Sequence, residues 1–144
     1  MSQFTEADRE AVKQAVLDYV EGVYEADLTK IMRSVHSDLA KRGFFNKEGE
    51  TGYSISPMTF PQLLDLAKSY NKNSRIPHDA AKEVIVYDAL DQIASAKLIA
   101  WWGIDYMHLA KYDGKWMVVN VLWQTHTNQD DRLADMGDRQ ITEV

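Results

Sequence analysis

Cysteine is absent from this chain of 144 residues. Its absence excludes disulfide bonds, thiolate metal ligands and cysteine nucleophiles. The chain also lacks a run of about 18 apolar residues, which a membrane-spanning helix requires. Its first residues contain no basic stretch followed by an apolar one, so we expect no signal peptide and a cytoplasmic location.

Positive charge is scarce. The 16 Lys and Arg residues are outnumbered by 22 Asp and Glu residues, and the formal net charge is −6. Because clustered cations hold nucleic acids and anionic membranes, we expect neither as a partner. The sequence contains no phosphate-binding loop or dinucleotide fingerprint, and His78, His108 and His126 lack metal-ligand spacing, so we expect no cofactor and no metal.

One core can be built from this composition. Apolar residues make up 45% of the chain, which is enough for a single domain, predicted to span residues 1–127. Residues 128–144 carry five acidic and two basic side chains, which is half of the net negative charge. We expect this segment to be an acidic extension that is mobile or loosely docked.

Capping signals predict three helices before residue 82. Thr5 with Asp8, and Thr59 with Gln62, have the spacing of capping boxes, and Asp27 can cap a short helix between them. The first helix carries apolar residues in two adjacent rows: Ala11, Ala15, Tyr19 and Val23, and Val12, Val16, Val20 and Tyr24. The buried faces expected for the next two helices consist of Leu28, Ile31, Met32 and Val35, and of Phe60, Leu63, Leu64 and Ala67.

The apolar period changes from helix to strand after residue 82. Four strands are expected, over residues 83–87, 93–102, 104–112 and 115–124. Asp113 and Gly114 separate the last two and predict a two-residue hairpin loop with both residues at positive φ. A short strand that begins at His36 and a bend are expected over 36–45, and a loop or frayed hairpin over 46–57. Helices followed by a meander of strands indicate an α+β fold with helices on an antiparallel sheet.

Strand alternation, counted from this hairpin, assigns the side chains of the last two strands to two faces. The helix-facing side is expected to carry Asp105, Met107, Leu109, Trp116, Val118, Asn120 and Leu122. The opposite side is expected to carry Tyr106, His108, Val119, Val121 and Trp123. A half-exposed sheet has one plainly polar face, and neither of these faces is polar. We therefore expect a homodimer through Val119, Val121 and Trp123.

Two polar residues stand among apolar ones on the helix-facing side. Asp105 and Asn120, surrounded by Met107, Trp116 and Leu122, fit a small-molecule pocket with apolar walls and few polar anchors. Burial would raise the pKa of Asp105 and make it a general acid or base. The alternative is that Asp105 lies hydrated at a strand end and that Asn120 bonds to the backbone.

Further candidates for the pocket come from other elements. His36 and Asp38 can share one face of the strand after the second helix and transfer a proton together, or they can form a surface pair. The hydroxyl of Tyr24 and the indole of Trp101 can reach a ligand, although both rings also suit the core.

Two pairs lie near the expected mouth of the pocket. Tyr53 and Met58 are in or beside the long loop, which can act as a lid. Lys41 and Arg42, the one adjacent basic pair, can hold an anionic group. Their alternative is a charged pair in solvent.

Three segments resemble one protein family. The run Ile104–Trp123, the stretch Val35–Gly43 and the tripeptide Pro57–Thr59 are similar to the lumazine-binding branch of the nuclear-transport-factor-two-like superfamily. The resemblance implies a cystatin-like cone, in which three N-terminal helices pack on a strongly bent antiparallel sheet, and it implies a dimer. Relatives with this fold include ketosteroid isomerase, polyketide cyclases, scytalone dehydratase and non-catalytic carriers, so the fold does not determine the function.

Three functions are consistent with these features. The first is binding of a small, largely apolar or aromatic organic molecule in the cone pocket. The second is acid/base catalysis of the isomerase, dehydratase or polyketide-cyclase type, with Asp105 or the His36–Asp38 pair transferring the proton. The third is a non-catalytic oligomerisation module whose cone is filled by its own side chains. A cavity larger than about 300 Å³ would favour the first two.

Overall fold

The computed structural model describes residues 4–46 and 51–126. Its helices are α1 (Glu6–Glu25), α2 (Leu28–Ser34) and α3 (Phe60–Ser69). Its strands are β1 (Val35–Phe45), β2 (Ser54–Met58), β3 (Lys82–Ala89), β4 (Ile93–Ala100), β5 (Gly103–Tyr112) and β6 (Lys115–Thr125). The α+β fold class is confirmed, whereas the extension predicted over 128–144 lies outside the described residues. None of the helices in the described ranges is long and apolar enough to cross a bilayer.

The predicted capping residues begin all three helices. The Thr5 hydroxyl accepts a hydrogen bond from the Asp8 backbone N–H, and the Asp8 carboxylate accepts one from the Thr5 backbone in return. Thr59 and Gln62 form the same reciprocal pair at α3, and Asp27 caps α2 through one backbone N–H. These bonds satisfy donors that a first helical turn leaves unpaired, so each helix start is determined locally.

The six strands form one sheet in the order β2-β1-β6-β5-β4-β3. Strands β3 to β6 form the predicted antiparallel meander, and β2 pairs antiparallel with β1. Strand β1 runs parallel to β6, so the sheet is mixed. The prediction of a wholly antiparallel sheet is therefore wrong. The chain between these two strands contains four strands and a helix, and such a long connection permits either direction.

Strand β1 is longer than expected and finds a partner in the predicted loop. It has eleven residues, and the edge strand β2 pairs with its second half, from Lys41 opposite Met58 to Phe45 opposite Ser54. Pro57 is tolerated in β2 because an edge strand has one side without ladder hydrogen bonds. The Gly, Pro and polar residues of this segment concealed the strand.

The predicted hairpin between β5 and β6 is confirmed. Asp113 and Gly114 have φ angles of 50° and 79°, and Tyr112 pairs with Lys115 on either side of them. Both loop residues therefore adopt the left-handed region that a two-residue hairpin loop requires.

A β-bulge in β6 changes the faces beyond it. Leu109 pairs with Val118 and His108 pairs with Asn120, so the register skips Val119. One extra residue in a strand inverts the alternation that follows it. The predicted faces are therefore wrong for the four residues after the bulge: Asn120, Val121, Leu122 and Trp123.

Burial confirms that these four residues have exchanged faces. Val121 is fully buried, and Trp123 packs against the core. Leu122 is 43% exposed, and the side-chain amide of Asn120 lies 3.2 Å from the ring of His108 on the outer face. Asn120 and Leu122 thus do not belong to the pocket. Val121 does not belong to the outer surface, and Trp123 lines the cavity although it also borders a hollow of the outer face.

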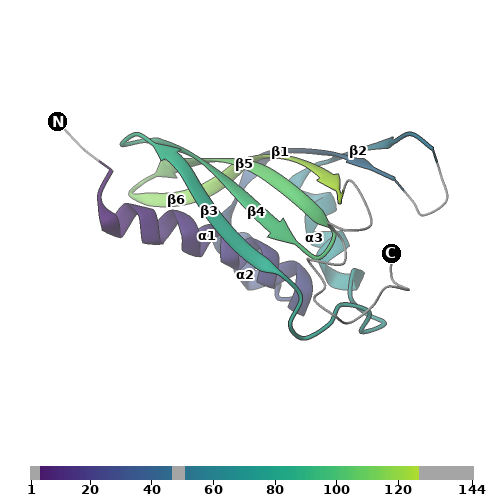
Figure 1. Ribbon diagram of the computed structural model, residues 1–144. Helices are drawn as coiled ribbons and strands as arrows, with labels where there is room; N and C mark the ends of the chain where they lie inside the picture. The colour runs from purple at the N-terminus through teal and green to yellow at the C-terminus, as the bar shows by residue number, and fades with distance from the viewer. Residues whose placement is uncertain (1–3, 47–50, 127–144) are drawn as a thin grey trace.

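The helices cover one face of the sheet, with α1 lying along it (Figure 1). The core between the layers combines apolar residues of α1 with inward residues of the strands, among them Val12, Val16, Tyr19, Val20, Leu98, Met107, Leu109 and Val118. The predicted helix faces are correct except at Ala11 and Met32, which are exposed. The candidate site lies where α1 and α3 meet β1, β2 and β6.

Candidate functional site

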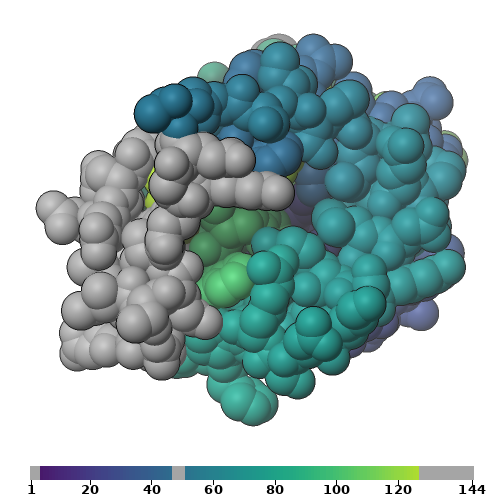
Figure 2. Space-filling model, turned by 90° about the vertical axis from the view of Figure 1, so that its right-hand side faces the viewer, coloured from purple at the N-terminus to yellow at the C-terminus, as the bar shows by residue number. Residues whose placement is uncertain are grey.

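A cavity of about 320 Å³ lies between the helices and the strands β1, β2 and β6. Its lining residues are Val23, Lys41, Phe45, Ser56, Met58, Leu66, Tyr70, Trp102 and Trp123. At the same end of the molecule, Figure 2 shows a hollow between the blue β1–β2 segment and the teal segment around α3, with green atoms at its floor. The volume exceeds the lower limit of about 300 Å³ that is usual for ligand pockets.

Aromatic rings give this cavity much of its wall. Phe45, Tyr70, Trp102 and Trp123 all line it. Tyr70 meets Trp102 edge to face with ring centroids 5.7 Å apart, and Tyr24 packs on Trp102 at the same distance from within the protein. Rings held in this way present flat, apolar surfaces to a ligand.

Lys41 provides a cation in the wall. It is only 6% exposed, and its Nζ donates a hydrogen bond of 2.7 Å to the hydroxyl of Tyr19. Burial lowers the pKa of Lys41 to about 8, and the charge of Asp105 opposes this shift. The predicted alternative of a charged pair in solvent is therefore wrong for Lys41, although Arg42 is exposed.

Asp105 lies on the helix-facing side, where strand alternation placed it, and has no exposed surface. Its Oδ1 accepts a hydrogen bond of 2.8 Å from the indole N–H of Trp102, and its Oδ2 has no hydrogen-bond partner among the described residues. Burial raises the pKa of Asp105 to about 6, against the opposing effects of Lys41 and Trp102. The alternative of a hydrated carboxylate at a strand end is wrong. Asp105 is not one of the residues that line the cavity.

Tyr19 interacts with both ionisable groups. It accepts the hydrogen bond from Lys41, and its hydroxyl helps to lower the pKa of Asp105. Burial, followed by the negative charge of Asp105, raises the pKa of Tyr19 well above its ordinary value, so the hydroxyl keeps its proton. Lys41, Tyr19 and Asp105 form a buried ionisable cluster that reaches the cavity through Lys41.

The predicted ligand-binding residues are only partly brought together. Met58 lines the cavity. The hydroxyl of Tyr24 accepts a hydrogen bond from the backbone of Trp101 and donates one to the carbonyl of Ala81. It therefore links the residue before β3 to the residue after β4. The indole of Trp101 packs under the guanidinium of Arg75, 5.0 Å from its ring centroid, and does not line the cavity.

The other predicted ligand-binding residues lie elsewhere. Met107 and Trp116 belong to the core, and the indole N–H of Trp116 donates a hydrogen bond of 3.0 Å to Asp8 at the start of α1. Tyr53 is 49% exposed and does not line the cavity. The loop therefore contributes to the site through β2 and not through Tyr53.

His36 and Asp38 lie away from the cavity. The His36 ring stacks on Tyr112 beside the hairpin, with centroids 4.2 Å apart. Its Nδ1 accepts a hydrogen bond of 3.0 Å from the backbone N–H of Asp38. This arrangement matches the predicted alternative of a surface pair.

The sequence could have decided between the two alternatives for Lys41, an anion-holding residue or a charge in solvent. Leu39, Lys41 and Gly43 alternate on the buried side of β1, so the strand period places Lys41 inside. Trp123 was missed because the bulge has no sequence signal that we recognise. Tyr70 follows the last turn of α3, where helical periodicity no longer indicates which face a residue occupies.

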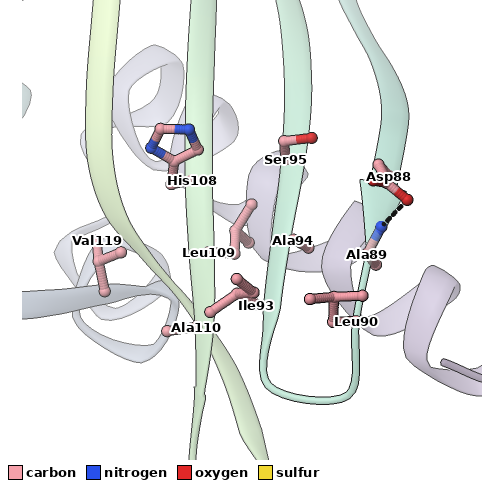
Figure 3. A pocket seen from close by; sticks show the side chains of 10 residues that line it. All are labelled: Asp88, Ala89, Leu90, Ile93, Ala94, Ser95, His108, Leu109, Ala110 and Val119. Atoms are coloured by element: carbon pink, nitrogen blue, oxygen red, sulfur yellow. Dashed lines mark hydrogen bonds between the residues drawn. The ribbon is translucent and has the colours of Figure 1, made fainter. Parts of the chain in front are cut away.

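A more open groove of about 410 Å³ lies across β3, β4 and β5 (Figure 3). Ile93, Ser95, His108, Ala110 and Val119 are among its lining residues. It has no buried charged group in its wall, unlike the smaller cavity with Lys41. We therefore assign the candidate site to the smaller cavity. Residues 4–46 and 51–126 contain no group of three or more His, Asp or Glu residues that could hold a metal ion.

Comparison with solved structures identifies the fold. An NTF2-like protein of unknown function from Shewanella baltica is 20% identical, with a TM-score of 0.60 over 86% of this chain and 98% of that chain. A protein of unknown function with a cystatin-like fold from Nostoc punctiforme is 14% identical, with a TM-score of 0.59 over 88% and 97%. A "Putative Scytalone Dehydratase" from Novosphingobium aromaticivorans is 10% identical, with a TM-score of 0.56 over 84% and 85%. These identities support a shared fold and not a shared activity.

Comparison with family models identifies the family. The model described as "Putative lumazine-binding" matches residues 7–124, which is most of the chain. No curated protein matches significantly. The chain belongs to this lumazine-binding family and has the nuclear-transport-factor-two-like, cystatin-like fold.

Proposed function

We propose that this protein binds a small, flat, largely apolar or aromatic organic molecule in the cavity between the helices and the sheet. The observation that carries the proposal is a cavity of about 320 Å³ whose wall combines aromatic rings with the buried cation of Lys41. Small-molecule sites are mostly apolar and contain a few placed polar groups. Membership of a lumazine-binding family agrees with a ligand-binding role.

The indole N–H signals of the four tryptophans test this function by NMR. Trp102 and Trp123 line the cavity, whereas the indole of Trp116 contacts Asp8 at the start of α1. A neutral aromatic probe, 2-naphthalenemethanol, should shift the signals of Trp102 and Trp123 with one saturable curve and leave that of Trp116 unchanged. Equal shifts of all four signals, or no saturable shift, would contradict the proposal.

A cavity-filling variant provides a second test. Leu66→Trp adds a ring inside the cavity and should abolish probe binding, because the added ring occupies the space of the ligand. Ile55→Trp adds the same ring on β2, where the side chain is 63% exposed, and serves as the matched control. Loss of binding in both variants would argue against this cavity as the site.

A second candidate function is acid/base catalysis by the buried ionisable cluster. The pKa values of about 6 for Asp105 and about 8 for Lys41 bracket neutral pH, as proton-transfer groups require. Because Asp105 does not line the cavity, Lys41 would exchange the proton with a ligand. Titration of the Asp105 carboxyl by NMR tests this candidate. An ordinary value near 4 would remove it.

We propose that the expected homodimer forms through the outer face of the sheet, with contact residues that differ in part from those predicted. Of the three predicted contact residues, Val119 borders the outer groove and Trp123 borders a second hollow on this face. Phe44, Tyr106 and Leu122 are 37%, 53% and 43% exposed and border a common hollow of about 340 Å³ on this face. Exposed apolar patches mark interaction surfaces, and a second copy offers the same patch for an isologous contact.

A further inference from the structure

We propose that the ligand carries one anionic oxygen group, such as an aromatic carboxylate, which pairs with the ammonium of Lys41, and that Asp105 takes up a proton as this anion binds. The inference rests on the proposed binding function and names the chemical class of the ligand.

The ammonium of Lys41 has bonding capacity left for a ligand. An ammonium carries three N–H donors, and in the described part of the chain that of Lys41 makes one hydrogen bond, to the neutral hydroxyl of Tyr19. The residue is 6% exposed and lines the cavity, so its remaining donors are sheltered from bulk solvent. A buried cation is costly unless an anion is close to it, and a carboxylate in the cavity would provide one.

Asp105 is the present counter-charge of Lys41, although the two do not form an ion pair within the described residues. An anion bound at Lys41 would bring two negative charges to one cation. Protonation of Asp105 removes this repulsion, and burial already raises its pKa to about 6. The unpartnered Oδ2 is the atom on which the proton can be placed.

The proton uptake is assigned to the Asp105–Lys41 pair and not to the other titratable groups near Asp105. Tyr19 on α1 and Tyr70 after α3 have pKa values raised by burial, so they stay neutral. His126, which follows β6, is 7% exposed and lies 3.0 Å from the carbonyl of Ala100 through its Nε2. A His126→Gln variant separates its contribution from that of Asp105.

Two probes with the same ring system test the inference by calorimetry on the full chain. 2-Naphthoate carries the anion, and 2-naphthalenemethanol is its neutral counterpart. Wild-type protein should bind naphthoate about ten-fold more tightly than the alcohol at pH 5.5, as expected for a charge-assisted hydrogen bond. Naphthoate affinity should fall by about three-fold between pH 5.5 and pH 6.5, a range in which Asp105 titrates and Lys41 stays charged, and buffers of different ionisation enthalpy should show proton uptake. Alcohol affinity should not change with pH.

The variants assign each effect to a residue. Lys41→Met should lose the preference for naphthoate and keep alcohol binding, which also reports that the variant is folded; Lys41→Gln is the second variant. Asp105→Asn should lose most of the fall in naphthoate affinity between pH 5.5 and pH 6.5, whereas any dependence above pH 7 reports Lys41, whose pKa is about 8. His126→Gln should keep the pH dependence of the wild type.

The outcomes separate the inference from the binding function. Equal affinities for the two probes, or a naphthoate preference that persists in Lys41→Met and Lys41→Gln, would overturn the inference and leave the binding function standing. A fall in naphthoate affinity between pH 5.5 and pH 6.5 that is undiminished in Asp105→Asn would overturn the proton uptake at Asp105. Failure of folded wild-type protein to bind either probe would overturn both proposals.

Discussion

The indole of Trp123 lies directly against the backbone of Gly43, its neighbour on the parallel strand β1. A Cβ added to Gly43 would overlap the indole ring, so the ring would have to move. The same ring lines the cavity. The absence of a side chain at residue 43 therefore sets the position of one cavity wall.

A side chain at residue 43 should change the shape of the cavity by displacing Trp123, which forms part of its wall. Gly43→Ala should displace Trp123 towards the cavity, weaken probe binding and destabilise the protein by about 1–3 kcal/mol, the usual cost of overpacking. Urea denaturation and the indole N–H shift of Trp123 measure the two effects. Gly52→Ala is the control for probe binding alone: a Cβ there meets no atom within 4 Å, so probe binding should not change, although its φ of 81° makes alanine cost some stability.

Asp105 should make the protein less stable at neutral pH than in mild acid. Its pKa is raised from 3.8 to about 6, so the native state holds the proton more tightly than the unfolded state. This stabilisation is fully present below the unfolded pKa and is lost as pH rises through 6, by about 3 kcal/mol in total. The neighbouring groups are Lys41, Tyr19, Tyr70 and His126.

The Asp105→Asn variant tests this linkage. The free energy of unfolding, measured in urea at several values between pH 4 and pH 7, should fall more steeply for wild-type protein than for the variant. Asp65→Asn, at a carboxylate whose side chain is 78% exposed, should follow the wild-type curve. Parallel curves for wild type and Asp105→Asn would show that Asp105 is not buried as described.

The hairpin loop allows a test of backbone conformation alone. Gly114 has a φ of 79°, and a Cβ there would meet no atom within 4 Å. Gly114→Val should destabilise the protein by about 1 kcal/mol or more, because β-branched residues resist positive φ. Gly114→Asn should cost less, since asparagine tolerates this region. Equal urea midpoints for wild type and Gly114→Val would contradict the assigned turn.

The outer sheet face can be tested by sedimentation velocity. Leu122→Glu places a charge in the middle of the proposed contact and should convert a dimer into a monomer. Thr29→Glu, on the exposed side of α2, should leave the sedimentation coefficient unchanged. A dimer that persists in Leu122→Glu would locate the interface elsewhere. Trp123 is unsuitable for this test because it lines the cavity.

Features with local causes could be predicted from the sequence. The caps at Thr5, Asp27 and Thr59 and the turn at Asp113 each depend on residues within three positions, and all four are present. The family resemblance supplied the cone, which local signals could not have provided. Features that depend on distant pairing were missed, including β2 and the parallel contact of β1 with β6.

The candidate site was only half predictable for the same reason. Strand alternation correctly placed Asp105 inside, because no irregularity separates it from the hairpin along β5. The same counting failed on β6 beyond Val119. For Lys41 both an anion-holding role and a solvated charged pair were considered because of its charge, and its position in β1 is consistent with burial.

The bulge at Val119 determines which side chains of β6 face the cavity and which face the outer surface of the sheet. Asn120 and Leu122 now point outward, while Val121 and Trp123 point inward. Removal of Val119 alone would leave Asn120 opposite His108 in a regular ladder and keep both pairs on their present faces. If every residue were kept and the ladder closed without the bulge, the two pairs would change faces. An amide and a leucine would then enter the ligand space, and the indole would move to the exterior. The extra residue therefore determines the chemistry of the cavity and of the outer face together.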